Sequence, residues 1–125
     1  MIVSDLAKCT PIPGAEGTLI KQIFHPHNTM LGIGYSISQC VIGPGKSSKP
    51  HKLKSSEIYF VTKGHGVLHV DDESSDIAEN QAVYIPPLSR QFVRNTGKTD
   101  LEFLCIVEPA WKQEDETIEQ TPQVQ

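Results

Sequence analysis

The stretch KPHKLKSSEIYFVTKG, residues 49–64, decides how the rest of the chain is interpreted. It places His51 six positions before Glu57, at the entrance to an apolar strand that ends at Gly64. Successive side chains of a strand point to opposite faces, so Glu57, Tyr59 and Val61 are expected to share one face. An imidazole close to a strand-borne carboxylate indicates either a metal site or what is left of one.

Alternating or continuous apolar runs recur along the chain, and none keeps a helical period over a useful length. The runs are TLIKQIF (18–24), GIGYSISQCVI (32–42), EIYFVT (57–62), GVLHV (66–70), AVYIP (82–86), QFVRN (91–95) and LEFLCIV (101–107). Turn-forming segments such as GPG, DDESS and NTGKTD separate them. This pattern predicts an all-β sandwich or small barrel.

The length of 125 residues suits one domain, which we expect to span residues 1–116. Residues 117–125 carry no apolar period and are predicted to form an acidic, mobile tail. Residues 1–111 contain 10 Lys and Arg against 11 Asp and Glu, a balance that argues against nucleic-acid binding. The apolar runs are too short to cross a bilayer, so no membrane partner is expected.

Three cysteines, Cys9, Cys40 and Cys105, are far apart in the sequence and form no C-x-x-C motif. An odd number of cysteines without a signal peptide predicts reduced thiols and a cytosolic location. Cys40 and Cys105 lie within apolar runs, where they are most simply small core residues.

The central part of the chain resembles the cupin family. GPGKSSKPHKLKSSEIYFVTKGHG (43–66) resembles the first motif of that family, and AENQAVYIPPLSRQFVRNTG (78–97) resembles the second. The similarity extends to small single-domain cupins described as mannose-6-phosphate isomerase-like. It implies a double-stranded β-helix, the jelly-roll barrel, completed by the flanking strands.

The resemblance also implies four metal-ligand positions, which are three histidines and one glutamate in the family. The matching residues here are His51, Leu53, Glu57 and Gln91, so two histidines are replaced. If a divalent metal such as zinc, nickel, iron or manganese binds, its ligands are His51, Glu57 and Gln91. The alternative is a satisfied polar cluster in which Gln91 donates to Glu57 or His51.

Further residues have a structural and a functional interpretation. Asn80 stands where the family has a turn glycine, and Asn tolerates a positive φ. His65 and His69 are predicted on one face of a strand, too far apart to share a metal ion. Trp111 is expected either to cap one end of the barrel or to contact a partner.

Two groups of basic or imidazole side chains are predicted to lie in loops. His25 and His27 in FHPHN belong to a predicted turn, where exposed histidines are ordinary. The lysines before the first-motif strand, with Arg90, form either a solvated loop or a weak funnel for an anionic ligand. These lysines are Lys46, Lys49, Lys52 and Lys54.

The sequence thus predicts a small cytosolic cupin that binds a small polar molecule, a sugar or an organic acid. His51, Glu57, Tyr59 and Gln91 are the expected polar lining of its barrel. The alternative is an enzyme: a metal-dependent sugar isomerase or oxygenase that uses His51 and Glu57, or a metal-free isomerase in which they act as acid and base. A homodimer is expected because several strands are apolar on both faces.

Overall fold

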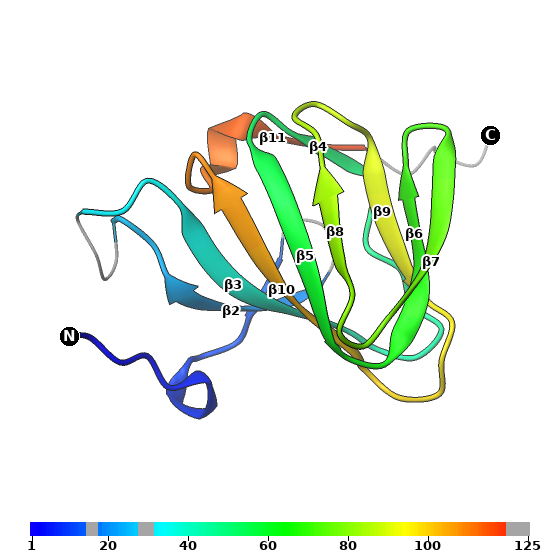
Figure 1. Cartoon of the computed structure of the whole chain (residues 1–125), viewed down its shortest axis with the longest axis horizontal. Helices are drawn as coiled ribbons and strands as arrows, with labels where there is room; N and C mark the ends of the chain where they lie inside the picture. Colours follow the sequence, from blue (N-terminus) through cyan, green and yellow to red (C-terminus); the bar gives the residue numbers. More distant parts are fainter. Residues whose placement is uncertain (15–17, 28–31, 120–125) are drawn as a thin grey trace.

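The computed structural model describes residues 1–14, 18–27 and 32–119, and in these ranges eleven strands form two antiparallel sheets (Figure 1). The strands are β1 Ile12–Pro13, β2 Leu19–Phe24, β3 Ser36–Ile42, β4 His51–Leu53, β5 Ser56–Lys63, β6 His65–Val70, β7 Glu73–Ala78, β8 Ala82–Ile85, β9 Gln91–Asn95, β10 Leu101–Glu108 and β11 Glu116–Ile118. Two short 3-10 helices, η1 (Leu6–Lys8) and η2 (Gln113–Asp115), complete the described elements. Among these residues no helix has the length and apolar character needed to span a membrane. The all-β jelly-roll barrel predicted from the sequence is confirmed.

The two sheets face each other across one apolar core. The six-stranded sheet has the order β1-β2-β3-β10-β5-β8, and the five-stranded sheet has the order β11-β4-β9-β6-β7. In β10 every second side chain is buried, because the odd-numbered residues point between the sheets and the even-numbered ones point outward. The core cluster consists of Cys40, Ile42, Tyr59, Val61, Leu68, Ile77, Ile85, Val93, Leu101, Phe103 and Cys105.

One strand lies in a segment that the sequence predicted as a turn. In DDESS only Asp71 and Asp72 form the turn, and Glu73 already begins β7. This strand buries a single side chain, Ile77, and it is held by backbone pairing to β6 from Val70 to His65. A strand that is stabilised mainly by its ladder carries no hydrophobic alternation, so its sequence does not identify it.

The C-terminal boundary also differs from the prediction. Thr117 and Ile118, which we expected in a mobile tail, pair with β4 as part of β11. Beyond them, the Glu119 amide donates to the Pro50 carbonyl at 2.8 Å, and both Glu119 carboxylate oxygens accept from the Arg90 guanidinium at 2.7 and 2.9 Å. The rest of the predicted tail, residues 120–125, lies outside the described residues.

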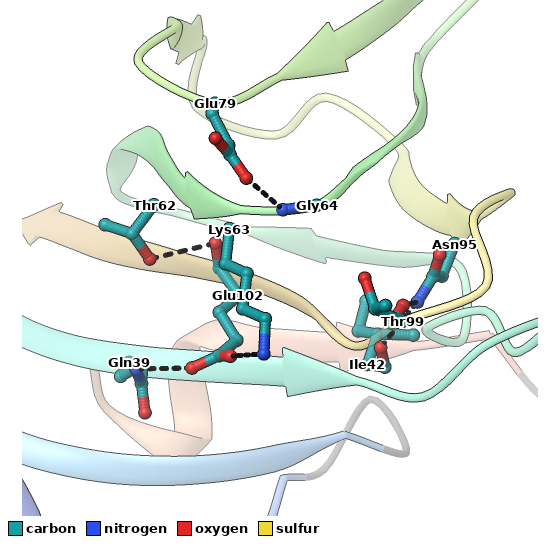
Figure 2. Close-up of polar contacts among 9 residues, drawn as sticks. All are labelled: Gln39, Ile42, Thr62, Lys63, Gly64, Glu79, Asn95, Thr99 and Glu102. Carbon is teal, nitrogen blue, oxygen red and sulfur yellow. Dashed lines mark hydrogen bonds and ion pairs between the residues drawn. The ribbon is translucent and has the colours of Figure 1, made fainter.

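Asn80 and Asn95 hold turns that link the sheets. Asn80 adopts a φ of 69°, the positive value that was expected to be tolerated by asparagine at this turn. Figure 2 shows the Asn95 side chain, whose Nδ2 donates to the carbonyls of Ile42 and Thr99 at 2.8 Å each. Since Asn95 is 1% exposed, these bonds satisfy a polar group that would otherwise be costly inside the barrel.

The contact between Arg90 and Glu119 predicts a pH-dependent attachment of β11. Hydrogen bonds from Arg90 hold the pKa of Glu119 below its usual value of 4.5, and the contact raises the pKa of Arg90. A depressed carboxyl pKa stabilises the folded arrangement above the unfolded pKa, and this contribution is lost as pH falls through the folded pKa. The C-terminal end of β11 should therefore detach first at acid pH.

Backbone NMR between pH 7 and pH 3 checks this expectation. The amide signals of residues 117–119 should move toward random-coil positions only at the acid end in the wild type, and already at pH 7 in Glu119→Gln. The control is Glu114→Gln, which removes an exposed carboxylate nearby that forms no ion pair among the described residues. Identical titrations of wild type and Glu119→Gln would contradict the role of this contact.

Candidate functional site

A partly enclosed cavity of about 110 Å³ lies inside the barrel. Its walls are the inner face of the six-stranded sheet, the β4 and β11 edge of the five-stranded sheet, and Trp111. The apolar part of the lining includes Cys40, Phe103, Cys105 and Val107. The polar part includes Gln22, Ser38, His51, Glu57, Tyr59 and Glu116. The cavity is thus an apolar chamber with a few convergent polar groups, as small-molecule sites commonly are.

A chain of hydrogen bonds connects the two sheets beside this cavity. The Tyr59 hydroxyl, on β5, donates to Gln91 Oε1 on β9 at 2.5 Å. Gln91 Nε2 in turn donates to Glu57 Oε1, again on β5, at 2.6 Å. Gln91 itself is 1% exposed and does not line the cavity, so it acts behind the two residues that do. The predicted donation from Gln91 to Glu57 is confirmed.

His51 is a buried residue that lines the cavity. It is 5% exposed, and its Nδ1 lies 2.9 Å from the Lys49 carbonyl oxygen. A carbonyl only accepts, so Nδ1 carries the proton and Nε2 of the neutral ring is an acceptor. Among the described residues Nε2 has no hydrogen-bond partner, although His51 lines the cavity. An acceptor on a cavity-lining residue that has no protein partner is suited to a donor on a bound molecule.

The donor set does not fit a catalytic first-row metal. Such a metal generally takes three protein ligands and keeps an open position. Over the described ranges, no group of three or more His, Cys, Asp or Glu side chains is placed to hold one ion. Both polar atoms of the Gln91 amide are already engaged with protein groups, since Oε1 accepts from Tyr59 and Nε2 donates to Glu57. The metal interpretation of His51, Glu57 and Gln91 is therefore not supported by their geometry.

Leu53 occupies one of the metal-ligand positions that the family resemblance implies. It lies two residues after His51 on β4, and both side chains are buried on the same face of the strand. Where the family carries an imidazole, this chain therefore has hydrocarbon at 2% exposure. The lysines at 46, 49, 52 and 54 are all exposed, and none of them lines the cavity. Their interpretation as a solvated loop agrees with this placement.

His25 is a correction to the sequence analysis. It was expected to be exposed in a turn, but it is 7% exposed, whereas His27 is exposed as predicted. His25 Nε2 lies 2.7 Å from the Trp111 carbonyl oxygen, and the Trp111 amide donates to Ser36 Oγ at 3.0 Å. These contacts hold the Trp111 backbone, and the residue lines the cavity. It was expected either to cap one end of the barrel or to contact a partner.

Sequence reasoning missed several parts of the lining, including residues of β1 and β2 such as Ile12 and Gln22. Ser36, Ser38 and Cys40 share the inner face of β3, which the alternation in SISQC could have indicated. Glu116 lines the cavity from β11, a strand of three residues in an otherwise polar segment. No local pattern identifies so short a strand, because its position depends on pairing with β4.

Comparison with known proteins identifies the family. The cupin domain, Cupin_2, matches residues 38–107, which is more than half of the chain. The chain is 29% identical over 119 residues to the uncharacterized protein MJ1618 of Methanocaldococcus jannaschii, covering 94% of each chain. It is also 34% identical over 65 residues to an oxalate-binding protein of Thermotoga maritima, covering 51% of this chain and 54% of that one.

Solved structures share the same architecture. A predicted oxalate decarboxylase of Thermotoga maritima superimposes with a TM-score of 0.77 at 22% identity, covering 86% of this chain and 99% of that chain. At this identity the likeness shows the fold alone. The chain belongs to the cupin family.

The hydrogen-bonded chain predicts the stability of two variants. Gln91→Leu removes the acceptor of the Tyr59 hydroxyl and the donor to Glu57 in one substitution. It should lower the free energy of unfolding by roughly 1–3 kcal/mol for each buried group that loses its partner. Tyr59→Phe removes only one bond and should cost less, about 0.5–1.5 kcal/mol. Urea unfolding monitored by circular dichroism measures both. Equal losses in the two variants would contradict a linked chain of bonds.

Proposed function

We propose that this cupin binds a small polar molecule in the barrel cavity, with His51, Glu57 and Tyr59 at the ligand and Gln91 positioning the last two. The observation that carries the proposal is His51, a buried residue of the cavity lining whose Nε2 has no hydrogen-bond partner in the described ranges. Gln91 holds Glu57 and Tyr59 in fixed positions before any ligand arrives, and such preorganisation favours binding. The three cysteines are free thiols, which supports a reducing compartment such as the cytosol.

The enzyme alternative has two forms. A metal-dependent isomerase or oxygenase is disfavoured by the donor set, since a third strong ligand does not converge with His51 and Glu57 in the described residues. A metal-free isomerase is consistent with an imidazole and a carboxylate that line the same cavity. NMR of candidate sugars incubated with the protein distinguishes turnover from binding alone.

A cavity-filling variant tests the binding proposal. In a thermal-shift screen of sugars, organic acids and amines, a compound that binds the cavity should raise the melting temperature of the wild type. Ser38→Leu should abolish that shift, because the larger side chain extends into the chamber that Ser38 lines. The matched control is Ser74→Leu, exposed on β7. If no compound stabilises the wild type, or if Ser38→Leu responds equally, the barrel is not the binding site.

A second copy of the chain is the proposed partner of the outer face of the six-stranded sheet. An apolar row crosses four strands there, because the backbone register aligns neighbouring residues. The row consists of Ile37, Ile106, Ile58 and Tyr84. Ile58 and Tyr84 are 39% and 62% exposed, and Phe60, opposite Leu104 in the next row, is 36% exposed. A two-fold dimer would bury the same apolar patch on both copies.

Substitution in this row should separate the dimer. Light scattering at micromolar concentration should give twice the chain mass of 13.8 kDa for the wild type and the monomer mass for Ile58→Lys. The control is Val67→Lys, which places the same charge on the outer face of the five-stranded sheet. A monomeric wild type would contradict the proposed pairing.

A further inference from the structure

A second recess of the molecule is an open groove at the free edges of the two sheets. Its volume is about 840 Å³, and its walls are the β6–β7 hairpin on one side and β8 on the other. β8 is the last strand of the six-stranded sheet, and β7 is the last strand of the five-stranded sheet. The described residues that line this groove are all different from those that line the barrel cavity. The groove is therefore a surface separate from the proposed binding site.

The edge of β8 offers backbone groups for pairing. On its other side β8 pairs with β5, and in the same register the Val61 amide donates to the Gln81 carbonyl at 2.9 Å. Hydrogen-bonded and non-hydrogen-bonded pairs alternate in an antiparallel ladder, so the N–H and C=O groups of Ala82 and Tyr84 are directed away from β5. Within the described ranges no strand pairs with that side of β8. A free edge of this kind can accept one more strand.

The floor of the groove is apolar. Val70 of β6 and Val83 of β8 pack against the core cluster but are only partly buried. Leu68 and Pro86 complete the apolar part of the lining. Alternate side chains of an added strand point to the same face, so apolar residues at every second position of that strand can cover this floor.

The rim of the groove is acidic. Asp71, Asp72 and Glu73 are exposed lining residues, and exposed Asp and Glu side chains are negatively charged at pH 7. All 11 Lys and Arg residues of the chain lie within the described ranges, and none of them lines the groove. Asp71 is used by the fold, since its Oδ1 accepts from the Arg90 amide at 2.9 Å. Asp72 and Glu73 form no ion pair among the described residues and are accessible to the basic side chains of a partner.

We propose that this groove binds an extended segment of a partner protein in which basic residues alternate with β-branched apolar residues. The segment adds to the edge of β8, with its apolar side chains on Val70 and Val83 and its basic side chains beside Asp72 and Glu73. Backbone pairing supplies affinity, and the apolar floor and acidic rim select the sequence. Charged residues at a sheet edge also prevent pairing between copies, but that role does not account for the apolar floor.

Short peptides blocked at both ends test the proposal by calorimetric titration of the full chain at pH 7. A peptide of alternating lysine and valine should bind about tenfold or more tightly than one of alternating glutamate and valine. Two further lysine–valine peptides carry N-methyl groups, one on all its valine amides and the other on all its lysine amides. A strand pairs along one edge through every second residue, so one of these two should keep its binding and the other should lose it.

Charge-removing variants locate the effect on the surface. Asp72→Asn combined with Glu73→Gln should weaken binding of the lysine–valine peptide about tenfold. The control combines Asp100→Asn with Glu114→Gln, which removes the same charge from two exposed residues that do not line the groove. This control should leave binding unchanged, and it separates a contact in the groove from general attraction to a chain of net charge −4.

The inference is overturned if the lysine–valine peptide does not bind, if the glutamate–valine peptide binds as tightly, or if the two N-methylated peptides behave alike. It is also overturned if the control variant weakens binding as much as the groove variant. Ser38→Leu, which fills the barrel cavity, should bind the lysine–valine peptide as the wild type does. A loss of peptide binding in Ser38→Leu would contradict a groove separate from the cavity, whereas failure of the peptide tests leaves the proposed function untouched.

Discussion

The chain of hydrogen bonds from Tyr59 through Gln91 to Glu57 is the constraint on which the interior depends. It starts on β5, crosses to β9 and returns to β5, so it links the six-stranded sheet to the five-stranded one. Its members are 6% exposed or less, and a polar group at that depth is costly unless it is paired. A fully connected network satisfies these groups in one arrangement, which specifies the relative position of β5 and β9.

Two of the four metal-ligand positions implied by the family resemblance hold other residues, and this changes the chemistry of the barrel interior. With leucine at 53 and glutamine at 91, His51 no longer shares its surroundings with other imidazoles. Gln91, at a position where the family provides a metal ligand, binds two neighbouring side chains. The result is a small cavity with a preorganised carboxylate and an imidazole acceptor, which suits recognition of an organic molecule better than coordination of a metal.

The C-terminal strand contributes to the same cavity from the opposite side. β11 pairs with β4 through three residues and places Glu116 in the lining. Its end is held by the contact of Glu119 with Arg90, which lies next to Gln91 at the start of the second motif. The segment with the most acidic composition therefore supplies part of the site. It also adds a second carboxyl side chain to a lining that already contains Glu57.

The fold class follows from local sequence patterns, because the alternation along EIYFV and LEFLCIV requires strands with one buried face. The same patterns also determined which motif residues share a face, so that Glu57, Tyr59 and Gln91 could be predicted to meet. Three features became evident only in the folded chain: Gln91 lies behind the cavity, His25 is buried against Trp111, and Glu116 lines the chamber. These features depend on pairing and packing between segments far apart in the chain, as in β4 with β11. Local sequence patterns do not predict such contacts, because a short polar strand is positioned by backbone pairing with its neighbour.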